Sequence, residues 1–405
     1  MKTWEEISAL VNYDESKVPA YTLPDALLKA NGSRVKNAYE WVNFQRPKIL
    51  ELYKRGLYGQ TLPRPDETRF EVISEKKDAL GGKALRREIR VSSGMAGGRK
   101  HHFDLLLYVP RGARGRVPVF IGLNFKGNHT VSNEKDVAFT GAADNRVDGR
   151  RGCDSHRMSF EDVLSRGYAS ATACYEDVLP DPYPFDPHPW DKGVFGLLFD
   201  ERERSGLHER CSMIGAWAWG LSRIADYLET DPHIDAGRMA VHGHSRLGKT
   251  ALWAGATDRR FGLVISNDSG CGGAALYRRR FGETPLAMAY NFPNWFVAAH
   301  DKYVENEDAM PFDQHMLISL MAPRPVCVAS ATEDLWADPR GEYLSAYHAG
   351  EVYRLFGAAG LLPEDMPLPD TPLSGAVSYH LRKGKHDQNE KDWAHYLGLA
   401  DMFFK

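Results

Sequence analysis

The sequence predicts an α/β fold of three layers, in which helices cover both faces of a mostly parallel sheet. Two observations predict it. From about residue 160 to the end, apolar runs of strand length alternate with helical stretches, which is typical of a parallel sheet. The earlier apolar runs follow one another without intervening helices, which indicates antiparallel strands at one edge. With 405 residues, 43% of them hydrophobic, the chain can bury a large core.

The first part of the chain divides into a segment and the start of a domain. Residues 1–65 are polar and contain prolines, so we expect an N-terminal segment that wraps around the rest, with one short helix around Ala38–Tyr53. Residues 66–405 are expected to form a single α/β domain with loop insertions around 130–160 and 177–212. Its first strands are expected at Arg69–Ser74, Ala84–Val91, Phe103–Val109 and Val117–Phe125.

The alternating part continues to the C-terminus. We expect strands at Tyr168–Cys174, Arg238–His242, Phe261–Asn267, Pro325–Ser330 and Ala376–Leu381. Helices are expected at Phe160–Arg166, Ile214–Glu229, Leu247–Thr257, Arg340–Phe356 and Glu390–Phe403. The stretch Asp177–Lys192 is rich in Pro and Asp, which argues against regular structure and predicts a loop over the functional end of the sheet.

Composition argues against several classes of partner. The 51 basic and 54 acidic residues give a net charge of −3, so no basic field favours nucleic acid or an anionic membrane surface. The apolar runs are too short to span a bilayer, and the first residues lack the apolar region of a signal peptide. We therefore expect a cytoplasmic protein, or a secreted or periplasmic one if a leader was removed, and a monomer. Five scattered cysteines without a C-x-x-C pair indicate buried free thiols.

The segment Arg238–Leu252 carries the chemistry. It reads as a strand, a tight turn and a helix, and two incompatible motifs fit it. In the first, Gly243 and Ser245 belong to a nucleophile elbow, whose strained turn presents a serine hydroxyl at the end of a strand. In the second, the letters from Gly243 to Thr250 match a phosphate-binding P-loop. By letters alone the P-loop matches better, because Leu247 replaces the second Gly of the usual elbow.

The rest of the chain favours the elbow. A P-loop needs a later strand that ends in an acidic residue for Mg²⁺, whereas polar residues interrupt Leu263–Asp268. An elbow predicts a carboxylate and then a histidine after later strands. Asp334 follows the strand Pro325–Ser330, and His386 follows the last strand. We therefore interpret Ser245 as a nucleophile and His386 as the base that takes its proton.

The acid that orients the histidine has three candidates. Asp334 is favoured because it follows the strand that normally supplies this residue. Asp268 follows the preceding strand, and Glu333 adjoins Asp334. Arg246 directly follows the nucleophile, so its backbone N–H is the expected donor to the oxyanion of the reaction. No metal or other cofactor is expected.

The motifs around these residues resemble those of the glucuronoyl esterases, carbohydrate esterase family 15 of the α/β-hydrolase superfamily. The elbow reads G-H-S-R-L-G-K from Gly243 to Lys249, and the likeness covers roughly residues 10 to 405. The other matching segments are Asn124–His129, Asp268–Gly273, Glu283, Glu333–Pro339 and Gly384–His386. Some members of the family, notably fungal ones, carry the triad acid as Glu at the position of Asp268.

The resemblance implies hydrolysis of esters of (4-O-methyl-)glucuronic acid, as in the bonds between glucuronoxylan and lignin in lignocellulose. It adds the guanidinium of Arg246 as a second, charged donor to the oxyanion, and it implies that Lys249, Glu283 and Trp336 contact the sugar. The alternatives are an acetyl-type carbohydrate esterase and, from another class, a P-loop nucleotide-binding protein. The basic cluster Arg278–Arg280 is interpreted as a solvated helix face.

Overall fold

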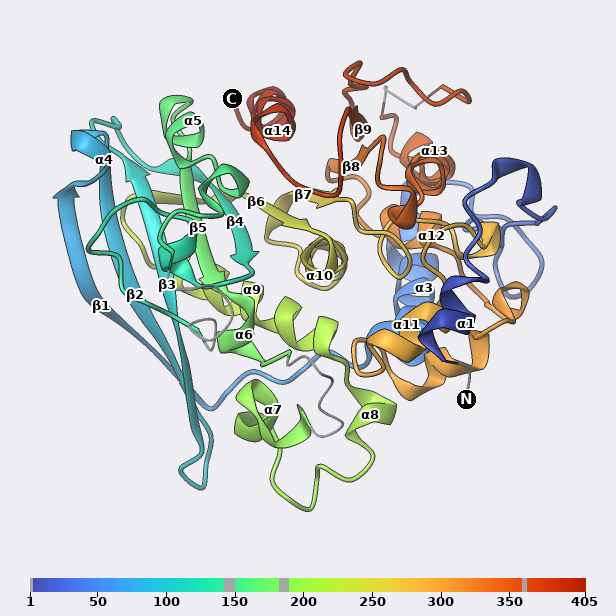
Figure 1. Cartoon of the computed structure of the whole chain (residues 1–405), viewed down its shortest axis with the longest axis horizontal. Helices are drawn as coiled ribbons and strands as arrows, with labels where there is room; N and C mark the ends of the chain where they lie inside the picture. The colour runs from blue at the N-terminus through green and yellow to red at the C-terminus, as the bar shows by residue number, and fades with distance from the viewer. Residues whose placement is uncertain (1–2, 142–149, 182–188, 359–362) are drawn as a thin grey trace.

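The computed structural model describes residues 3–141, 150–181, 189–358 and 363–405 (Figure 1). Within these residues, nine strands form one sheet in the order β1-β2-β3-β5-β4-β6-β7-β8-β9. The strands from β1 to β3 pair antiparallel, and so do β3 and β5. From β5 onward every pair of neighbours is parallel. The expected α/β fold with an antiparallel edge is confirmed.

The secondary structure follows the hydrophobic pattern closely. The strands are β1 Glu67–Asp78, β2 Ala84–Gly94, β3 Lys100–Pro110, β4 Val117–Asn124, β5 Ala169–Cys174, β6 Ile234–His244, β7 Phe261–Asn267, β8 Val326–Ala331 and β9 Val377–Arg382. The helices are α1 Trp4–Ser8, α2 Ala38–Glu40, α3 Arg46–Tyr53, α4 Ala79–Gly82, α5 Phe160–Ser165, α6 Tyr175–Val178, α7 Gly193–Leu198, α8 Leu207–Arg210, α9 Met213–Leu228, α10 Arg246–Thr257, α11 Pro285–Asn291, α12 Gln314–Ser319, α13 Pro339–Arg354 and α14 Glu390–Phe404.

Alternate residues of the central strands pack into two separate apolar layers, as expected when both faces of a sheet are buried. On β8, Val326 and Val328 belong to the large cluster that includes residues of α9, α10 and α13. Cys327 and Ala329 belong to the opposite cluster, which includes residues of α5 and α14. Figure 1 shows α5 and α14 above the sheet and α9 and α10 below it.

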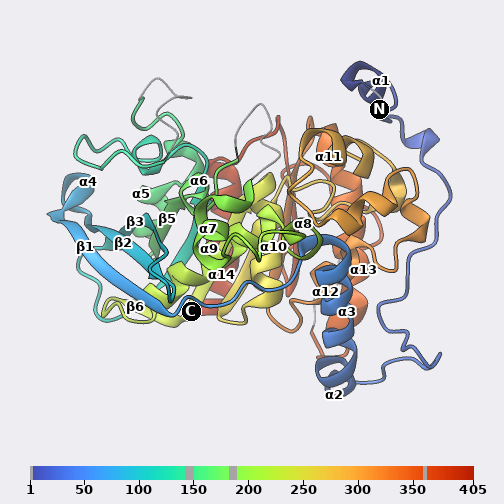
Figure 2. The same cartoon turned by 90° about the horizontal axis from the view of Figure 1, so that it is seen from below.

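The N-terminal segment contributes to the core as well as running along the surface. The expected helix over Ala38–Tyr53 is present, and it continues through a π-helical turn to Tyr58. Its apolar side chains Trp41, Ile49 and Tyr53 are almost fully buried. In Figure 2 the chain runs from α1 down one side of the molecule to α2 before it turns back into α3. The division of the chain at residue 65 stays a prediction.

The sequence also makes predictions about the loop after β5 and about the cysteines. The loop expected over Asp177–Lys192 is not fully irregular, because α6 extends to Val178 and a 3₁₀ turn covers Pro189–Asp191; residues 182–188 lie outside the described ones. The cysteines are free, and all except Cys153 are buried. Among the described residues, no helix has the length and apolar character needed to cross a membrane.

The interpretation of Arg278–Arg280 as a solvated face is wrong for two of the three residues. The side chains of Arg278 and Arg279 are only 5% and 3% exposed. Arg278 pairs with the buried Asp313 at 3.1 Å, and Arg279 pairs with the buried Asp338 at 2.8 Å. Buried arginines need such carboxylate partners, and these partners lie far along the chain, where sequence spacing gives no sign of them.

Candidate active site

Ser245 occupies a sharp turn between a central strand and a helix. It is the single residue between β6 and α10, and its backbone has φ 57° and ψ −129°. A positive φ is strained for a residue with a side chain. The strain is held by the neighbours, because the Ser245 N–H donates to the carbonyl of Asn267 on β7 at 2.8 Å. A side chain at Gly243 would lie 2.0 Å from the carbonyl oxygen of Leu247, so the turn requires glycine there.

The P-loop alternative does not fit this geometry. A phosphate-binding loop needs several residues between strand and helix, whose N–H groups surround the phosphate. Here the strand includes Gly243, the helix begins at Arg246, and only Ser245 lies between them. Lys249 and Thr250, which would contact the phosphates and Mg²⁺, lie inside the helix and are buried. The segment is therefore an elbow.

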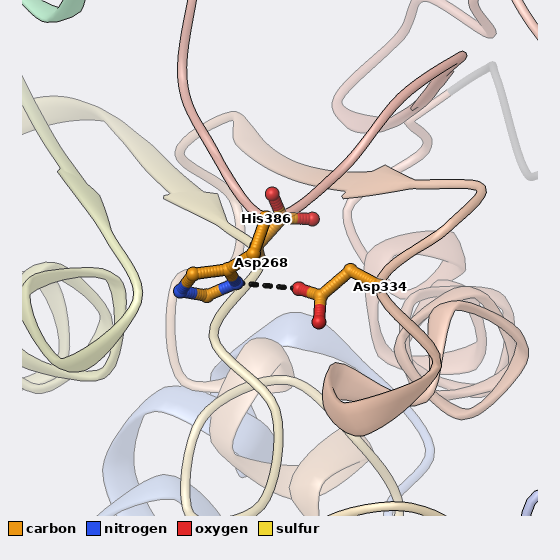
Figure 3. A group of neighbouring side chains, drawn as sticks. All are labelled: Asp268, Asp334 and His386. Carbon is orange, nitrogen blue, oxygen red and sulfur yellow. Dashed lines mark hydrogen bonds and ion pairs between the residues drawn. The ribbon is translucent and has the colours of Figure 1, made fainter.

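His386 and Asp334 come together beside this elbow, on the loops after β9 and β8. The Nδ1 atom of His386 and the Oδ2 atom of Asp334 are 2.6 Å apart, in hydrogen-bonding contact (Figure 3). The imidazole ring also packs against that of His244, with ring centres 4.4 Å apart, and His244 immediately precedes Ser245. An Nδ1–H held by a carboxylate leaves the Nε2 atom of His386 as the proton acceptor.

Asp268 lies close to this pair without sharing its hydrogen bond. One ligand-type atom each from Asp268, Asp334 and His386 lies within 4.8 Å of the others, but the Asp268 carboxyl is buried and accepts no hydrogen bond from the described residues. Burial and the neighbouring charges of Asp334 and Glu342 raise the pKa of Asp268 well above its ordinary value. The third candidate acid, Glu333, is exposed to solvent.

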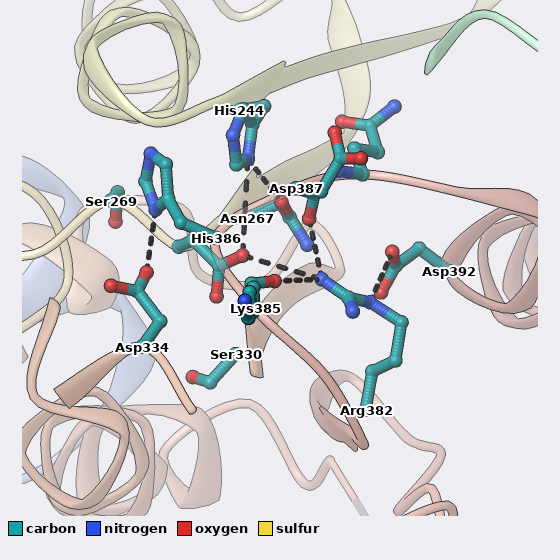
Figure 4. A network of polar contacts seen from close by, with 12 residues as sticks. His244, Asn267, Ser269, Ser330, Asp334, Arg382, Lys385, His386, Asp387 and Asp392 are labelled. Carbon is teal, nitrogen blue, oxygen red and sulfur yellow. Dashed lines mark hydrogen bonds and ion pairs between the residues drawn. The ribbon is translucent and has the colours of Figure 1, made fainter. Parts of the chain in front are cut away.

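Arg382 holds the loop that carries His386. Its buried guanidinium donates to the carbonyls of Lys385, at 2.9 Å, and Asp387, at 2.6 Å. These residues flank His386 on both sides (Figure 4). The Nε atom of Arg382 pairs with the buried carboxylate of Asp392 at 2.9 Å. The planar guanidinium of an arginine can make several such contacts at once. These contacts fix the backbone on both sides of His386.

The Arg246 side chain is held by a carboxylate and an aromatic ring. Its Nη1 atom donates to Asp181 at 2.7 Å. The guanidinium carbon lies 4.5 Å from the centre of the Trp295 ring, a cation–π distance. The indole N–H of Trp295 donates to the other oxygen of Asp181 at 3.2 Å. This arrangement fixes a cation one residue after Ser245.

The three residues implied as sugar contacts form one hydrogen-bonded chain. Lys249, one helical turn after Ser245, donates to Oε2 of Glu283 at 2.9 Å and to the carbonyl of Ser269 at 2.6 Å. The indole N–H of Trp336 donates to Oε1 of the same Glu283 at 3.1 Å. The Lys249 and Glu283 side chains are 3% and 6% exposed. The group is thus rigid and offers fixed donors and acceptors.

Comparison with known proteins decides the family. The family described as "Glucuronyl esterase, fungi" matches residues 191–357. A relative named carbohydrate esterase MZ0003, from an unknown prokaryotic organism, is 43% identical over 96% of this chain and 91% of its own length. The chain belongs to carbohydrate esterase family 15, the glucuronoyl esterases.

Solved structures of family 15 agree with this assignment over nearly the whole chain. A glucuronoyl esterase from Solibacter usitatus is 43% identical, covers 97% of this chain and 100% of its own, and superposes with a TM-score of 0.90. A promiscuous CE15 esterase from a marine bacterial metagenome is 42% identical, covers 97% and 100%, and gives a TM-score of 0.87. The protein is thus a carboxylic ester hydrolase with an α/β-hydrolase fold.

Sequence reasoning missed three residues that hold the candidate site residues in place: Asp181, Trp295 and Arg382. Asp181 lies 65 positions before its partner Arg246, and Trp295 lies 114 positions after Asp181, to which it donates. No local sequence pattern therefore links them. Arg382 is nearer, because it ends the strand that precedes His386. An arginine at the end of this strand was the one signal in the sequence that pointed to it. Its role is seen only from its contacts in the structure.

Proposed function

We propose that the protein hydrolyses esters of glucuronic acid, with or without a 4-O-methyl group, through an acyl-enzyme on Ser245. One observation carries the proposal. A serine in a strained elbow directly follows His244, whose ring packs on that of His386, and the Nδ1 atom of His386 is held by a buried carboxylate. This is the arrangement that activates a weakly nucleophilic hydroxyl.

In the first step, the Nε2 atom of His386 takes the hydroxyl proton while Oγ of Ser245 attacks the ester carbonyl. The carbonyl oxygen becomes an oxyanion, which the backbone N–H and the guanidinium of Arg246 stabilise. Asp334 stabilises the imidazolium that forms. The imidazolium then gives its proton to the departing alcohol, and the acyl group stays on the serine.

In the second step, water replaces the alcohol. His386 takes a proton from the water, whose oxygen attacks the acyl carbonyl, and a second oxyanion forms at the same donors. Collapse of this intermediate breaks the bond to Oγ of Ser245, and the oxygen regains its proton from His386. The products are the alcohol and glucuronic acid, and the residues return to their initial state without a cofactor.

The chain of Lys249, Glu283 and Trp336 supports a sugar acid as the acyl group. A glucuronoyl ester is uncharged, so its recognition needs hydrogen bonds to hydroxyls rather than a counter-charge. Lys249 supplies donors, Glu283 supplies acceptors, and the two charges balance within the buried pair. The relative from Solibacter usitatus is named a glucuronoyl esterase. We further propose a monomer, since one chain supplies the residues of the site. We also propose a cytoplasmic location, or a secreted or periplasmic one if a leader is removed.

A panel of substrates tests the proposal. The wild-type protein is expected to hydrolyse benzyl glucuronate, and Ser245→Ala is expected to lower kcat by at least about a thousandfold. The exposed Ser165, whose hydroxyl donates to the carbonyl of Asp162 on the surface of α5, offers a matched control: Ser165→Ala is expected to retain full activity. Product alcohol is measured by chromatography, and circular dichroism checks folding.

The panel also separates the alternatives. Hydrolysis of acetate esters alone would contradict glucuronic acid as the acyl group and would leave Ser245 as the nucleophile. Acetate esters belong in the panel because one relative is described as promiscuous. Full activity of Ser245→Ala would refute the nucleophile. Hydrolysis of Mg-ATP is not expected.

A further inference from the structure

Three partly exposed aromatic side chains meet at the edge of the site. The rings of Trp4 and Tyr290 are stacked with centres 6.0 Å apart, and the edge of Trp336 faces Trp4 at 6.2 Å. Trp4 is 39% exposed and Tyr290 43%. Large aromatic side chains normally bury more of their surface. We call Trp4, Tyr290 and Trp336 the aromatic shelf.

The shelf is assembled from segments far apart in sequence. Trp4 begins α1, Tyr290 lies on α11, and Trp336 lies in the 3₁₀ turn after β8. Figures 1 and 2 both show α1 beside α11. The short helix α1 is fixed by a capping box between Thr3 and Glu6 and by the buried side chain of Ile7. These contacts fix the helix that places Trp4 beside Tyr290 and Trp336.

The shelf is continuous with the residues proposed to hold the sugar. Trp336 belongs to both groups, because its indole N–H donates to Glu283, which pairs with Lys249. The shelf therefore adjoins Glu283 and Lys249 through Trp336. It adds apolar surface and no side-chain charge of its own.

The chemistry of a glucuronoyl ester decides what lies beyond these residues. The ester alcohol is attached through the carboxyl carbon, which must be at Ser245. The 2- and 3-hydroxyls lie on the far side of the pyranose ring from that carbon, and the 2-hydroxyl is next to the anomeric carbon; the 4-position, which can carry the methyl group, is nearer the carboxyl carbon. Residues that bind these hydroxyls therefore lie near the anomeric carbon, where the polysaccharide continues, and away from the alcohol. This step rests on the function proposed above.

We propose that the aromatic shelf binds the neutral β-linked pyranose chain to which the glucuronic acid is attached. The C–H bonds on one face of such a ring form an apolar surface, which packs on an aromatic ring while the hydroxyls at its rim stay in water. Xylan offers rings of this kind. Trp4 and Tyr290 then select esters on a polysaccharide over esters of the free sugar acid.

The test compares two esters with the same alcohol. The first is benzyl glucuronate, and the second is the benzyl ester of glucuronic acid linked to xylotriose. In Trp4→Ala/Tyr290→Ala, the ratio of kcat/KM for the second ester over the first is expected to fall roughly tenfold, mainly through KM. Trp4→Phe is expected to restore most of the ratio. Tyr39→Ala is the matched control, since Tyr39 lies on α2, is 68% exposed and makes an edge-to-face contact with Phe44, and α2 is far from α1 (Figure 2).

Three results would overturn the shelf. The first is an unchanged ratio. The second is an equal loss on both esters, which would make Trp4 a mere support for Trp336. The third is a loss of kcat/KM in the double variant that is larger for the benzyl ester of glucuronic acid than for its methyl ester. That result would mean that the alcohol, and not the polysaccharide, lies on the shelf.

Binding separates the shelf from the proposed reaction. Calorimetry with the unesterified oligosaccharide and Ser245→Ala needs no turnover, and weaker binding after Trp4→Ala is added supports the shelf. Equal binding contradicts it. Failure of the wild type to hydrolyse either ester would instead count against the proposed function alone.

Discussion

At the scale of single residues, two carboxyl groups compete for one histidine. Of the two, Asp334 makes the hydrogen bond to Nδ1 of His386, at 2.6 Å. Asp268 lies in the same cluster, but burial and the charges of Asp334, Glu342 and Asp392 raise its pKa. Two carboxylates this close do not both ionise easily. Asp268 instead lies 3.6 Å from the buried guanidinium of Arg382, so Asp334 is the carboxylate placed to stabilise the imidazolium.

The two aspartates should therefore respond differently to amidation. Asp334→Asn is expected to lower kcat by about 10⁴-fold, because an amide neither stabilises the imidazolium nor fixes the right tautomer. Asp268→Asn is expected to cost less than about tenfold, because Asp268 makes no hydrogen bond to His386 and an amide keeps the shape of the carboxyl. Steady-state kinetics with benzyl glucuronate at neutral pH measure both. A larger loss in Asp268→Asn would reverse the assignment.

At the scale of elements, the loop between β9 and α14 depends on one arginine. Arg382 is 3% exposed, and it connects the carbonyls on both sides of His386 to Asp392 on α14. Loops are ordinarily the more mobile parts of a fold. Here buried, charge-assisted hydrogen bonds fix the loop that carries the proposed base, His386.

Arg382→Lys is expected to loosen this loop. A lysine has a single nitrogen and cannot contact two carbonyls and Asp392 with the same geometry. We expect kcat to fall by roughly 10- to 100-fold, because the base is misplaced. We expect only a small change in KM, because the residues proposed to bind the sugar are unchanged. Lys383→Met, at the exposed next position, is the control and should retain activity. A lower Tm with unchanged kcat would restrict Arg382 to folding.

At the scale of the whole molecule, the N-terminal segment is tied into the domain through Arg46. The side chain is buried and donates from Nη2 to the carbonyl of Ala256, at 2.7 Å, and from Nε to that of Leu320, at 2.9 Å. These carbonyls end α10 and follow α12. Burial, with the charges of Arg324 and Arg259, lowers the pKa of Arg46 to about 10, so the side chain stays charged near neutral pH.

Arg46→Ala is expected to lower the free energy of unfolding by about 3 kcal/mol, because two buried carbonyls lose their donors and a cavity remains. Arg55→Ala is the control. Arg55 pairs with Glu51 one turn away at 2.7 Å but is 75% exposed, and such surface pairs contribute under about 1 kcal/mol. Urea unfolding followed by fluorescence measures both. Equal, small effects would show that the segment is held mainly by apolar packing.

Local patterns were enough to predict the architecture and the place of the site. Apolar runs of strand length, broken by helical periods, predict the alternating elements because burial on both faces requires that pattern. The elbow at Ser245 and the order of Asp334 and His386 after later strands predict where the side chains gather. Parallel strands bring their carboxyl ends to one edge of the sheet, so order along the chain translates into proximity.

Only the tertiary structure decided which groups meet within that place. The sequence by itself left Asp334, Asp268 and Glu333 as candidates, and burial with one hydrogen bond distinguishes them. The contact of Asp181 with Arg246 and the buried partner of Arg279 join residues 65 and 59 positions apart. A charged side chain is stable inside a protein only with such a partner. The partner is supplied by the folded chain, not by neighbours in sequence.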